Sequence, residues 1–212
     1  MPPEGEALRA ELLSHTPLAK LRQALPESEL TDTELLPHLS FTFAIEGISR
    51  ACSHQLVRHR GGSFSQQSQR YVSVRRLGEK VIMPPLIKEN AEELFTSHIE
   101  AASETYRRMV AEGVSKEDAR FVLPNAAETH LLMTMDGRSL IHFFGLRCCN
   151  RAQWEIRALA DEMLNEVKGM EPELFRRAGP YCFKLGHCPE GGFTCGRMKE
   201  VISSYSRLSI ES

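Results

Sequence analysis

Apolar and polar residues alternate most regularly over residues 39–46, where large apolar side chains occupy every second position. Successive side chains of a β-strand point to opposite faces, so this pattern predicts a strand with one face buried. Two longer segments, 90–113 and 153–170, instead space their apolar residues three and four positions apart, which predicts amphipathic helices. We expect Asn90 to cap the first of these helices and Gly113 to end it.

The other segments have weaker patterns. In the first part of the chain we expect a helix over 5–24 that breaks or restarts at Pro17, an irregular connection over 25–37 and a helix capped by Ser49. Short strands should follow over 71–74 and 81–83, and a short helix capped by Ser115 over 115–120. Towards the C-terminus we expect a buried strand or helical turn over 130–135, a helix starting in the turn 136–139, and an irregular tail from Gly179. The elements show no regular βαβ rhythm and no Gly-x-Gly-x-x-Gly motif. The sequence therefore predicts an α+β fold and argues against a Rossmann fold.

Composition narrows the class of protein. The chain of 212 residues suits one domain of ordinary size, spanning residues 1–212. Its net charge of −2 argues against a dedicated nucleic-acid or membrane binder. We find no signal-like N-terminus and no apolar run long enough to span a bilayer. We therefore expect a soluble cytoplasmic protein.

The chain has six cysteines, and three of them, Cys182, Cys188 and Cys195, lie in the tail. Zinc sites normally contain two closely spaced pairs of ligands, and the spacing here is looser. We therefore expect reduced thiols with a structural role, and no metal.

Positive charge is concentrated in one part of the chain. Residues 47–78 contain six arginines and two histidines but no lysine, aspartate or glutamate. A guanidinium grips phosphate or carboxylate with two hydrogen bonds, and Gly61-Gly62 lets the backbone approach a ligand closely. Three serines and four glutamines of residues 55–71 add neutral hydrogen-bonding groups. A solvated basic face is the alternative, but this composition favours a site for an anionic ligand.

Two further arginines, Arg120 and Arg147, stand beside hydrophobic runs. Each alone could be an arginine whose stem packs on apolar neighbours or that pairs with an acid. Together with the basic segment they suggest a ligand with more than one anionic group. Cys148 and Cys149 follow Arg147, whose charge would lower a thiol pKa, so one of them could be a thiolate nucleophile. A structural role is the other interpretation.

The spacing Arg58-His59-Arg60, seven residues and then Ser68, closely resembles the signature of the flavin-dependent thymidylate synthases, and Arg70-Tyr71 continues the match. The resemblance extends over about residues 41–157. It implies a central, mostly antiparallel sheet flanked by helices, in a homotetramer whose active sites are built from several subunits. It also implies that dUMP is methylated to dTMP, with methylenetetrahydrofolate as carbon donor and NADPH as the electron source through FAD.

The resemblance also implies roles for individual residues. Contacts to dUMP are implied for Gln55, Arg58, Gln66, Gln67, Ser68, Gln69, Arg70, Arg120 and Arg147. Contacts to FAD are implied for Arg58, His59, Arg60, Gln66, Asp136, Arg138 and His142. Arg147 is the implied catalytic residue, because a fixed cation near N3 of uracil would stabilise the ionised ring. Since the family attaches no enzyme thiol to the base, Cys148 and Cys149 are interpreted as structural. Ser68 is interpreted as a hydrogen-bond donor, because no nearby residue clearly supplies the base that a serine nucleophile needs.

One segment departs from the family pattern. The family usually has a Ser or Thr-Pro ahead of a Glu-His pair near the flavin, whereas this chain has Thr33, then Pro37 before His38. The departure motivates a second interpretation: a non-catalytic nucleotide- or RNA-binding relative that retains the anion site. RNA binding dominated by phosphate contacts should weaken steeply with salt, and the slightly acidic chain already disfavours it.

Overall fold

The computed structural model describes residues 8–27, 29–71 and 80–208. These residues form two compact units. The first contains residues 45–55, 65–71 and 80–131 together with Leu8, and the second contains residues 9–27, 29–44, 56–64 and 132–208. The interpretation of residues 1–212 as a single domain stays a prediction.

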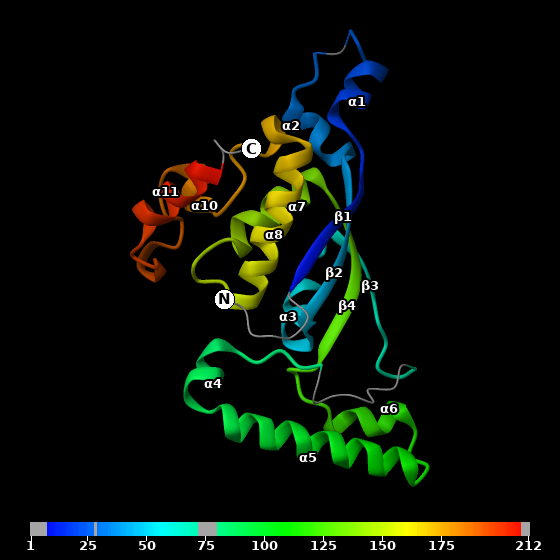
Figure 1. Ribbon diagram of the computed structural model, residues 1–212. Helices are drawn as coiled ribbons and strands as arrows, with labels where there is room; N and C mark the ends of the chain where they lie inside the picture. The colour runs from blue at the N-terminus through cyan, green and yellow to red at the C-terminus, as the bar shows by residue number, and fades with distance from the viewer. Residues whose placement is uncertain (1–7, 28, 72–79, 209–212) are drawn as a thin grey trace. The chain divides into compact units, whose positions relative to one another are not determined.

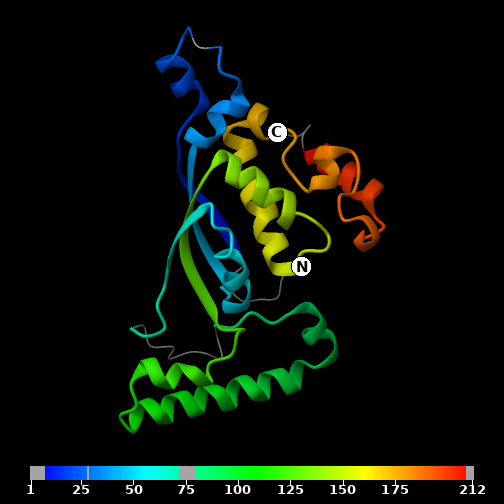
Figure 2. The ribbon, with the colours of Figure 1, turned by 180° about the vertical axis from the view of Figure 1, so that it is seen from behind.

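The elements can be followed in two opposite views (Figures 1 and 2). The strands are β1 (Arg9–His15), β2 (Ser40–Ser49), β3 (Gly62–Gln66) and β4 (Glu128–Asp136). The longer helices are α1 (Leu18–Ala24), α3 (Arg50–Leu56), α5 (Glu92–Ala111), α7 (Gly137–Arg147), α8 (Trp154–Met170) and α11 (Met198–Leu208). The shorter helices are α2 (Asp32–Leu35), η1 (Leu36–His38), α4 (Pro85–Asn90), α6 (Lys116–Ala119), η3 (Arg120–Val122), α9 (Pro172–Phe175), α10 (Tyr181–Leu185) and η4 (Gly191–Phe193).

The strands form an open antiparallel sheet in the order β1-β2-β4-β3, which confirms the predicted α+β class and the antiparallel sheet. The alternation over residues 39–46 does produce a strand, β2, and Phe41, Phe43 and Ile45 on its inner face are fully buried. Residues 130–135 belong to β4, so the strand alternative was the right one for them. The third strand of the sheet, β3, lies in the serine- and glutamine-rich sequence after Arg60, for which no strand was predicted. Residues 72–74 of the strand predicted over 71–74 lie outside the described residues.

Residues 9–15 form strand β1, so the helix predicted over 5–24 is wrong for this part. The segment pairs with β2 at the edge of the sheet, and α8 packs against it. The Leu12 amide also donates to a Glu166 carboxylate oxygen at 3.3 Å. The predicted restart at Pro17 is confirmed, because α1 begins after it. The leucine spacing is a local signal, whereas pairing with β2 depends on distant residues.

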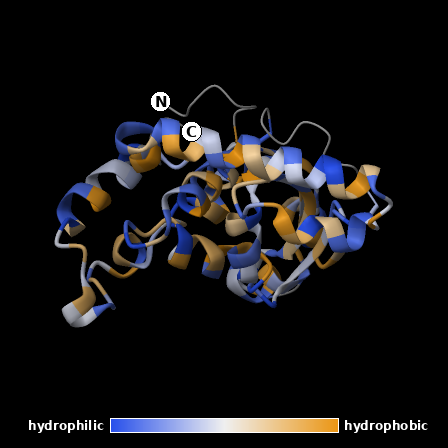
Figure 3. Ribbon diagram, turned by 90° about the horizontal axis from the view of Figure 1, so that it is seen from below, coloured by the Kyte–Doolittle hydropathy of each residue, from blue (hydrophilic) through white to orange (hydrophobic). Residues whose placement is uncertain are grey.

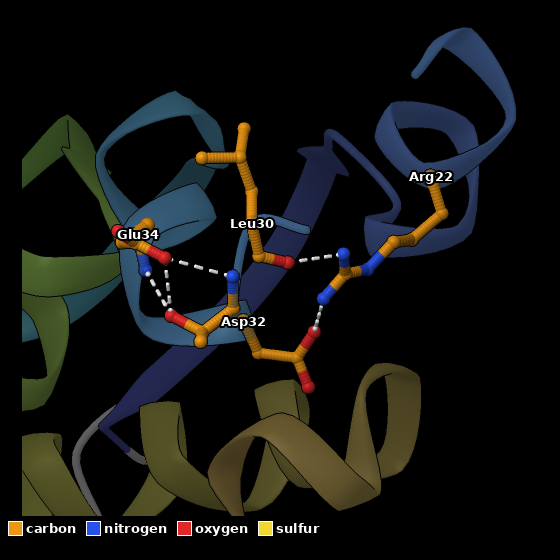
Figure 4. A network of polar contacts seen from close by, with 5 residues as sticks. Arg22, Leu30, Asp32 and Glu34 are labelled. Carbon is orange, nitrogen blue, oxygen red and sulfur yellow. Dashed lines mark hydrogen bonds and ion pairs between the residues drawn. The ribbon is translucent and has the colours of Figure 1, made fainter. Parts of the chain in front are cut away.

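The irregular connection predicted over residues 25–37 is also wrong at its C-terminal end, which forms α2 and η1. The Thr31 hydroxyl accepts from the Glu34 amide at 3.3 Å, and the Glu34 carboxylate accepts from the Thr31 amide at 2.8 Å. Arg22 donates to the Asp32 carboxylate at 2.6 Å and joins α1 to this capped turn (Figure 4). The Thr-x-x-Glu spacing is a capping-box signature that could have revealed the helix.

Helices α7 and α8 pack against each other in the second unit (Figure 1). Their core includes the fully buried Phe143 and Phe144 on α7. Phe144 meets Phe175 edge to face at 6.3 Å between ring centroids, and Phe175 meets Phe41 in the same way at 5.3 Å. This aromatic stack fixes α7 on the sheet, and α7 carries Arg147 at its C-terminal end.

The tail after Gly179 is helical in several places, so the irregular tail is a wrong prediction. Helix α10 packs on α7 and on α11. The Tyr205 hydroxyl of α11 donates to the Asp161 carboxylate at 2.5 Å and lies 3.2 Å from the Cys148 carbonyl oxygen. The glycine- and cysteine-rich sequence of the tail shows no helical pattern, because these helices are stabilised by packing rather than by local propensity.

Helix α5 dominates the first unit and buries Ile99, Ala102 and Tyr106 along one side. Hydrophilic and hydrophobic residues are interspersed along the helical ribbons, as amphipathic helices require (Figure 3). Gly113 follows the helix at φ 91°, in the left-handed region, which confirms the predicted terminator. Asn90 is not the N-cap, because it ends α4 and its amide donates to the Leu86 carbonyl. In the described ranges, no helix is both long and apolar enough to cross a membrane.

Two smaller predictions concern segments next to this helix. Ser115 caps α6 as predicted, and its hydroxyl accepts from the Asp118 amide at 3.2 Å. The strand predicted over 81–83 is reduced to a single antiparallel bridge between Val81 and Ala127.

Candidate active site

The Arg58-His59-Arg60 triplet follows helix α3, which ends at Leu56. Ser49 caps this helix, and its hydroxyl accepts from the Cys52 amide at 3.0 Å. After the helix the chain turns tightly, with the Gly62 amide donating to the His59 carbonyl at 3.0 Å. A side chain at Gly61 would place its Cβ 2.9 Å from the Cβ of Ser139, so only glycine fits this approach to α7.

The triplet and helix α7 together enclose a cavity of about 460 Å³ in the second unit. Its polar lining consists of Arg58, His59, Arg60, Ser139, His142 and Arg147. No acidic side chain lines it among the described residues. Three guanidiniums and two imidazoles therefore face one space, which is the chemistry of an anion site.

Arg147 and His59 are coupled by a hydrogen bond. The Arg147 Nε–H donates to His59 Nε2 at 2.8 Å, so this ring nitrogen must be unprotonated. Burial, then the charge of Arg147 and then that of His142, lower the pKa of His59 to about 4. His59 is therefore a neutral acceptor at physiological pH, and it orients the Arg147 guanidinium.

We expect the stability of the ligand-free protein to fall as the pH drops from about 6.5 towards 4. In this window the unfolded chain protonates His59 and the folded protein does not, so protons favour unfolding. The midpoint of urea unfolding, measured at pH 7 and at pH 5, would show the effect. The difference between the two midpoints should be smaller in His59→Gln. His98→Gln on the exposed side of α5 is the matched control. Identical pH dependence in His59→Gln and the unmodified protein would contradict this assignment.

A second cavity of the same unit, of about 380 Å³, is lined by Arg138, His142 and Thr33 among others. Thr33 belongs to the segment that departs from the family pattern, and the sequence did not identify it as a site residue. His142 lines both cavities, and its Nδ1 is hydrogen-bonded to the Tyr181 hydroxyl. The structure thus brings Arg138 and His142 to one cavity, and their predicted contacts with FAD stay predictions.

Asp136 has a structural partner in this unit. Its carboxylate accepts from the Ser139 amide at 2.9 Å and from the Ser139 hydroxyl at 2.7 Å, and so caps α7. The predicted FAD contact of Asp136 stays a prediction. In either role the carboxylate fixes the start of the helix that ends at Arg147.

The first unit contains a third cavity, of about 450 Å³, which brings Gln69 and Arg120 together. Arg50 and His54, one turn apart on α3, line the same cavity, and sequence reasoning missed both. Burial, and secondarily the charge of Arg120, lower the pKa of Arg50. Two positive charges on one cavity favour an anionic ligand there. The i, i+4 spacing of Arg50 and His54 on a helix was the available signal.

The remaining predicted residues lie around these cavities in less enclosed positions. Gln66 donates from its amide to the Thr129 hydroxyl at 3.1 Å, and the Ser68 hydroxyl accepts from the Arg70 amide at 3.3 Å. Arg70 is exposed, 3.5 Å from a Glu117 carboxylate oxygen. Gln67 is exposed and Gln55 is half-buried on α3. Neither lines a described cavity, and their predicted contacts with dUMP stay predictions.

Comparison with known proteins identifies the family. The family model described as thymidylate synthase complementing protein matches residues 21–173. A flavin-dependent thymidylate synthase of Geobacter sulfurreducens is 51% identical over 99% of this chain and 95% of its own length. The chain belongs to the flavin-dependent thymidylate synthase family. A second member, from Nitratidesulfovibrio vulgaris, is 52% identical over 76% of this chain and 70% of its own length. The predicted family and enzyme class are confirmed, and the non-catalytic interpretation is not supported.

Solved structures show the same fold. Thymidylate synthase X from Helicobacter pylori, crystallised with FAD and dUMP, superposes with a TM-score of 0.64 and 24% identity over 79% of this chain and 97% of its own. The UMP/dUMP methylase PolB from Streptomyces cacaoi, bound to 5-Br dUMP, gives a TM-score of 0.64 and 22% identity over 79% of this chain and 93% of its own. Flavin-dependent thymidylate synthases therefore share this antiparallel sheet and its helices.

Proposed function

We propose that this protein converts dUMP to dTMP by reductive methylation, with FAD as cofactor, methylenetetrahydrofolate as carbon donor and NADPH as reductant. The observation that carries the proposal is the cavity where Arg58, Arg60 and Arg147 meet around a neutral His59. The family, and relatives crystallised with FAD and dUMP, support the choice of ligands.

The residues of the second unit fit a flavin dinucleotide. Arg58, His59 and Arg60 would hold its phosphates, since guanidiniums bind phosphate oxygens in pairs. Arg138 and His142 would bind it further along α7. When bound, the flavin supplies hydride-transfer chemistry, and the protein supplies position and charge.

Arg147 would act on the pyrimidine ring. Its Nε–H is occupied by His59 and its side chain is half-buried, so the guanidinium has a fixed direction. A fixed cation stabilises negative charge that develops on the ring without the cost of reorganising solvent. His59 is a positioning residue in this proposal, because it acts through Arg147.

Arg120 and Arg50 would bind the phosphate of dUMP, with His54 and Gln69 as hydrogen-bonding neighbours in the same cavity. A phosphate between the two guanidiniums would replace their mutual repulsion by charge-assisted hydrogen bonds. Arg50 and His54 extend the set of dUMP residues that the resemblance implies.

The active enzyme would be a homotetramer with shared sites, in the cytoplasm. Gln67 and Arg70 expose their side chains on the single chain, which leaves them accessible to a neighbouring subunit's ligand. Light scattering should give a mass about four times the 23.9 kDa of one chain, and a monomer would contradict shared sites.

The function has a direct test. The purified protein should be yellow, NADPH should bleach the flavin absorption in the absence of oxygen, and dTMP should form only when dUMP and methylenetetrahydrofolate are both present. Product can be measured by chromatography of the nucleotides. A protein that binds added FAD but forms no dTMP would contradict the reaction, and one that takes up no FAD would contradict the cofactor as well.

A further inference from the structure

Four cysteines from distant parts of the chain line one cavity of the second unit. Cys149 follows the end of α7, Cys182 lies in α10, and Cys188 and Cys195 lie in the loops between α10 and α11. The cavity has a volume of about 240 Å³. The sequence shows only three tail cysteines with loose spacing, and the fold adds the fourth.

These thiols are close enough to influence one another. Cys182 is buried, and Cys149, Cys188 and Cys195 are near enough to interact with it electrostatically. The fold thus brings four sulfur-bearing side chains to one space.

The backbone around the cysteines is built of tight turns. Gly186 ends α10 at φ 74°, and Gly196 directly follows Cys195 at φ 73°. Side chains other than glycine are strained in this region of φ, so the turns require these residues. The turns lead Cys188 and Cys195 back to the cavity that Cys149 and Cys182 already line.

We propose that Cys149, Cys182, Cys188 and Cys195 form a four-thiolate site for a thiophilic metal centre, with an iron–sulfur cluster as the favoured occupant. Four cysteines are the usual ligand set both for such clusters and for structural zinc. The centre would join the tail to the end of α7, two residues after Arg147. Arg147, which lines the cavity proposed for FAD, also lines this one, so the two sites adjoin at the end of α7.

The geometry favours a cluster over a single ion. A tetrahedral zinc ion with Zn–S bonds of about 2.3 Å requires sulfur atoms within roughly 4 Å of each other. Among the described residues, no three His, Cys, Asp or Glu side chains are grouped closely enough to hold one metal ion. A cluster contains its own bridging sulfides, so its cysteines surround a larger space than the ligands of a single ion do. The four cysteines here line one cavity of about 240 Å³.

Metal analysis of the full-length protein tests the site. The protein would be purified without oxygen, and iron, zinc and acid-labile sulfide would be measured per chain. About four irons and four sulfides per chain are expected for a cubane cluster. About one zinc per chain without sulfide would overturn the assignment of a cluster. A protein that stays free of both metals, even after anaerobic reconstitution with ferrous iron and sulfide or with zinc, would overturn the proposal.

Variants test the ligand assignment. Cys188→Ser and Cys195→Ser should each lower bound metal to less than about a third of the amount in the unmodified protein. Cys52→Ala is the matched control, because Cys52 does not line this cavity, and it should retain the metal. Full metal content in both serine variants would refute the assignment. Because dithionite-reduced clusters give a paramagnetic signal that oxidised flavin lacks, electron paramagnetic resonance distinguishes the two chromophores.

Discussion

Arg147→Lys is expected to lower kcat for dTMP formation by about 10²–10³-fold while leaving FAD bound. In the structure the Nε–H of Arg147 donates to His59, and this bond uses only one of the five N–H donors of the guanidinium. A lysine ammonium is a point charge that cannot keep the His59 contact and present a planar pair of donors at once. Single-turnover bleaching and reoxidation of the flavin would separate the chemical step from binding.

Two further variants are needed to interpret the effect of Arg147→Lys. Arg108→Lys, on the exposed side of α5, makes the same chemical change outside the site and should leave kcat unchanged. His59→Gln offers a different acceptor to Arg147 and should reduce kcat less than Arg147→Lys does, because it disturbs only the orientation of the guanidinium. Unchanged turnover of Arg147→Lys with bound flavin would refute the role proposed for Arg147.

Arg120→Ala is expected to raise KM for dUMP by about 10–100-fold, with a smaller change in kcat. Each charge-assisted hydrogen bond to phosphate contributes about 1.5–3 kcal/mol, and Arg120 lines the cavity together with Arg50. Arg50→Ala should raise KM in the same direction. Because both guanidiniums would bind one phosphate, their effects should not be additive, and a double-mutant cycle measures the coupling.

Ionic strength and ligand-free stability supply independent checks. Added salt should raise KM of the unmodified enzyme more steeply than KM of the double variant, since fewer charges remain to be screened. Without nucleotide, Arg50→Met should leave the free energy of unfolding unchanged or increase it, because the charge of Arg50 is disfavoured by burial and by Arg120. Arg107→Ala on α5 is the control for net charge. An unchanged KM in both single variants would place the phosphate elsewhere.

The segment of residues 33–38 shows what local signals can miss in a functional region. The sequence marks it as a departure from the family, yet its capping box is made by Thr31 and Glu34, and the fold places Thr33 on the cavity of Arg138 and His142. The family pattern is defined by positions along the sequence, whereas the residues that line a cavity are determined by the path of the folded backbone. A threonine at a different position in the sequence can therefore line the same cavity.

The sequence by itself determined the elements with strong internal periodicity, such as β2, α5 and α8, and it located the arginine-rich segment after α3. Burial of every second or every third and fourth residue depends only on near neighbours, and so do caps such as Ser49 and Ser115. The Arg-His-Arg spacing likewise identified the family without any structure.

Only the tertiary structure decided that residues 9–15 pair as a strand, that Arg50 joins Arg120, and that Cys149 meets the tail cysteines. In each case the stabilising or functional partner is distant in the sequence, and no periodicity connects the two. Pairing with β2 outweighed a helical leucine spacing, and the packing of α10 on α7 placed four thiols around one cavity. Contacts of this kind depend on the folded backbone, and local patterns do not contain them.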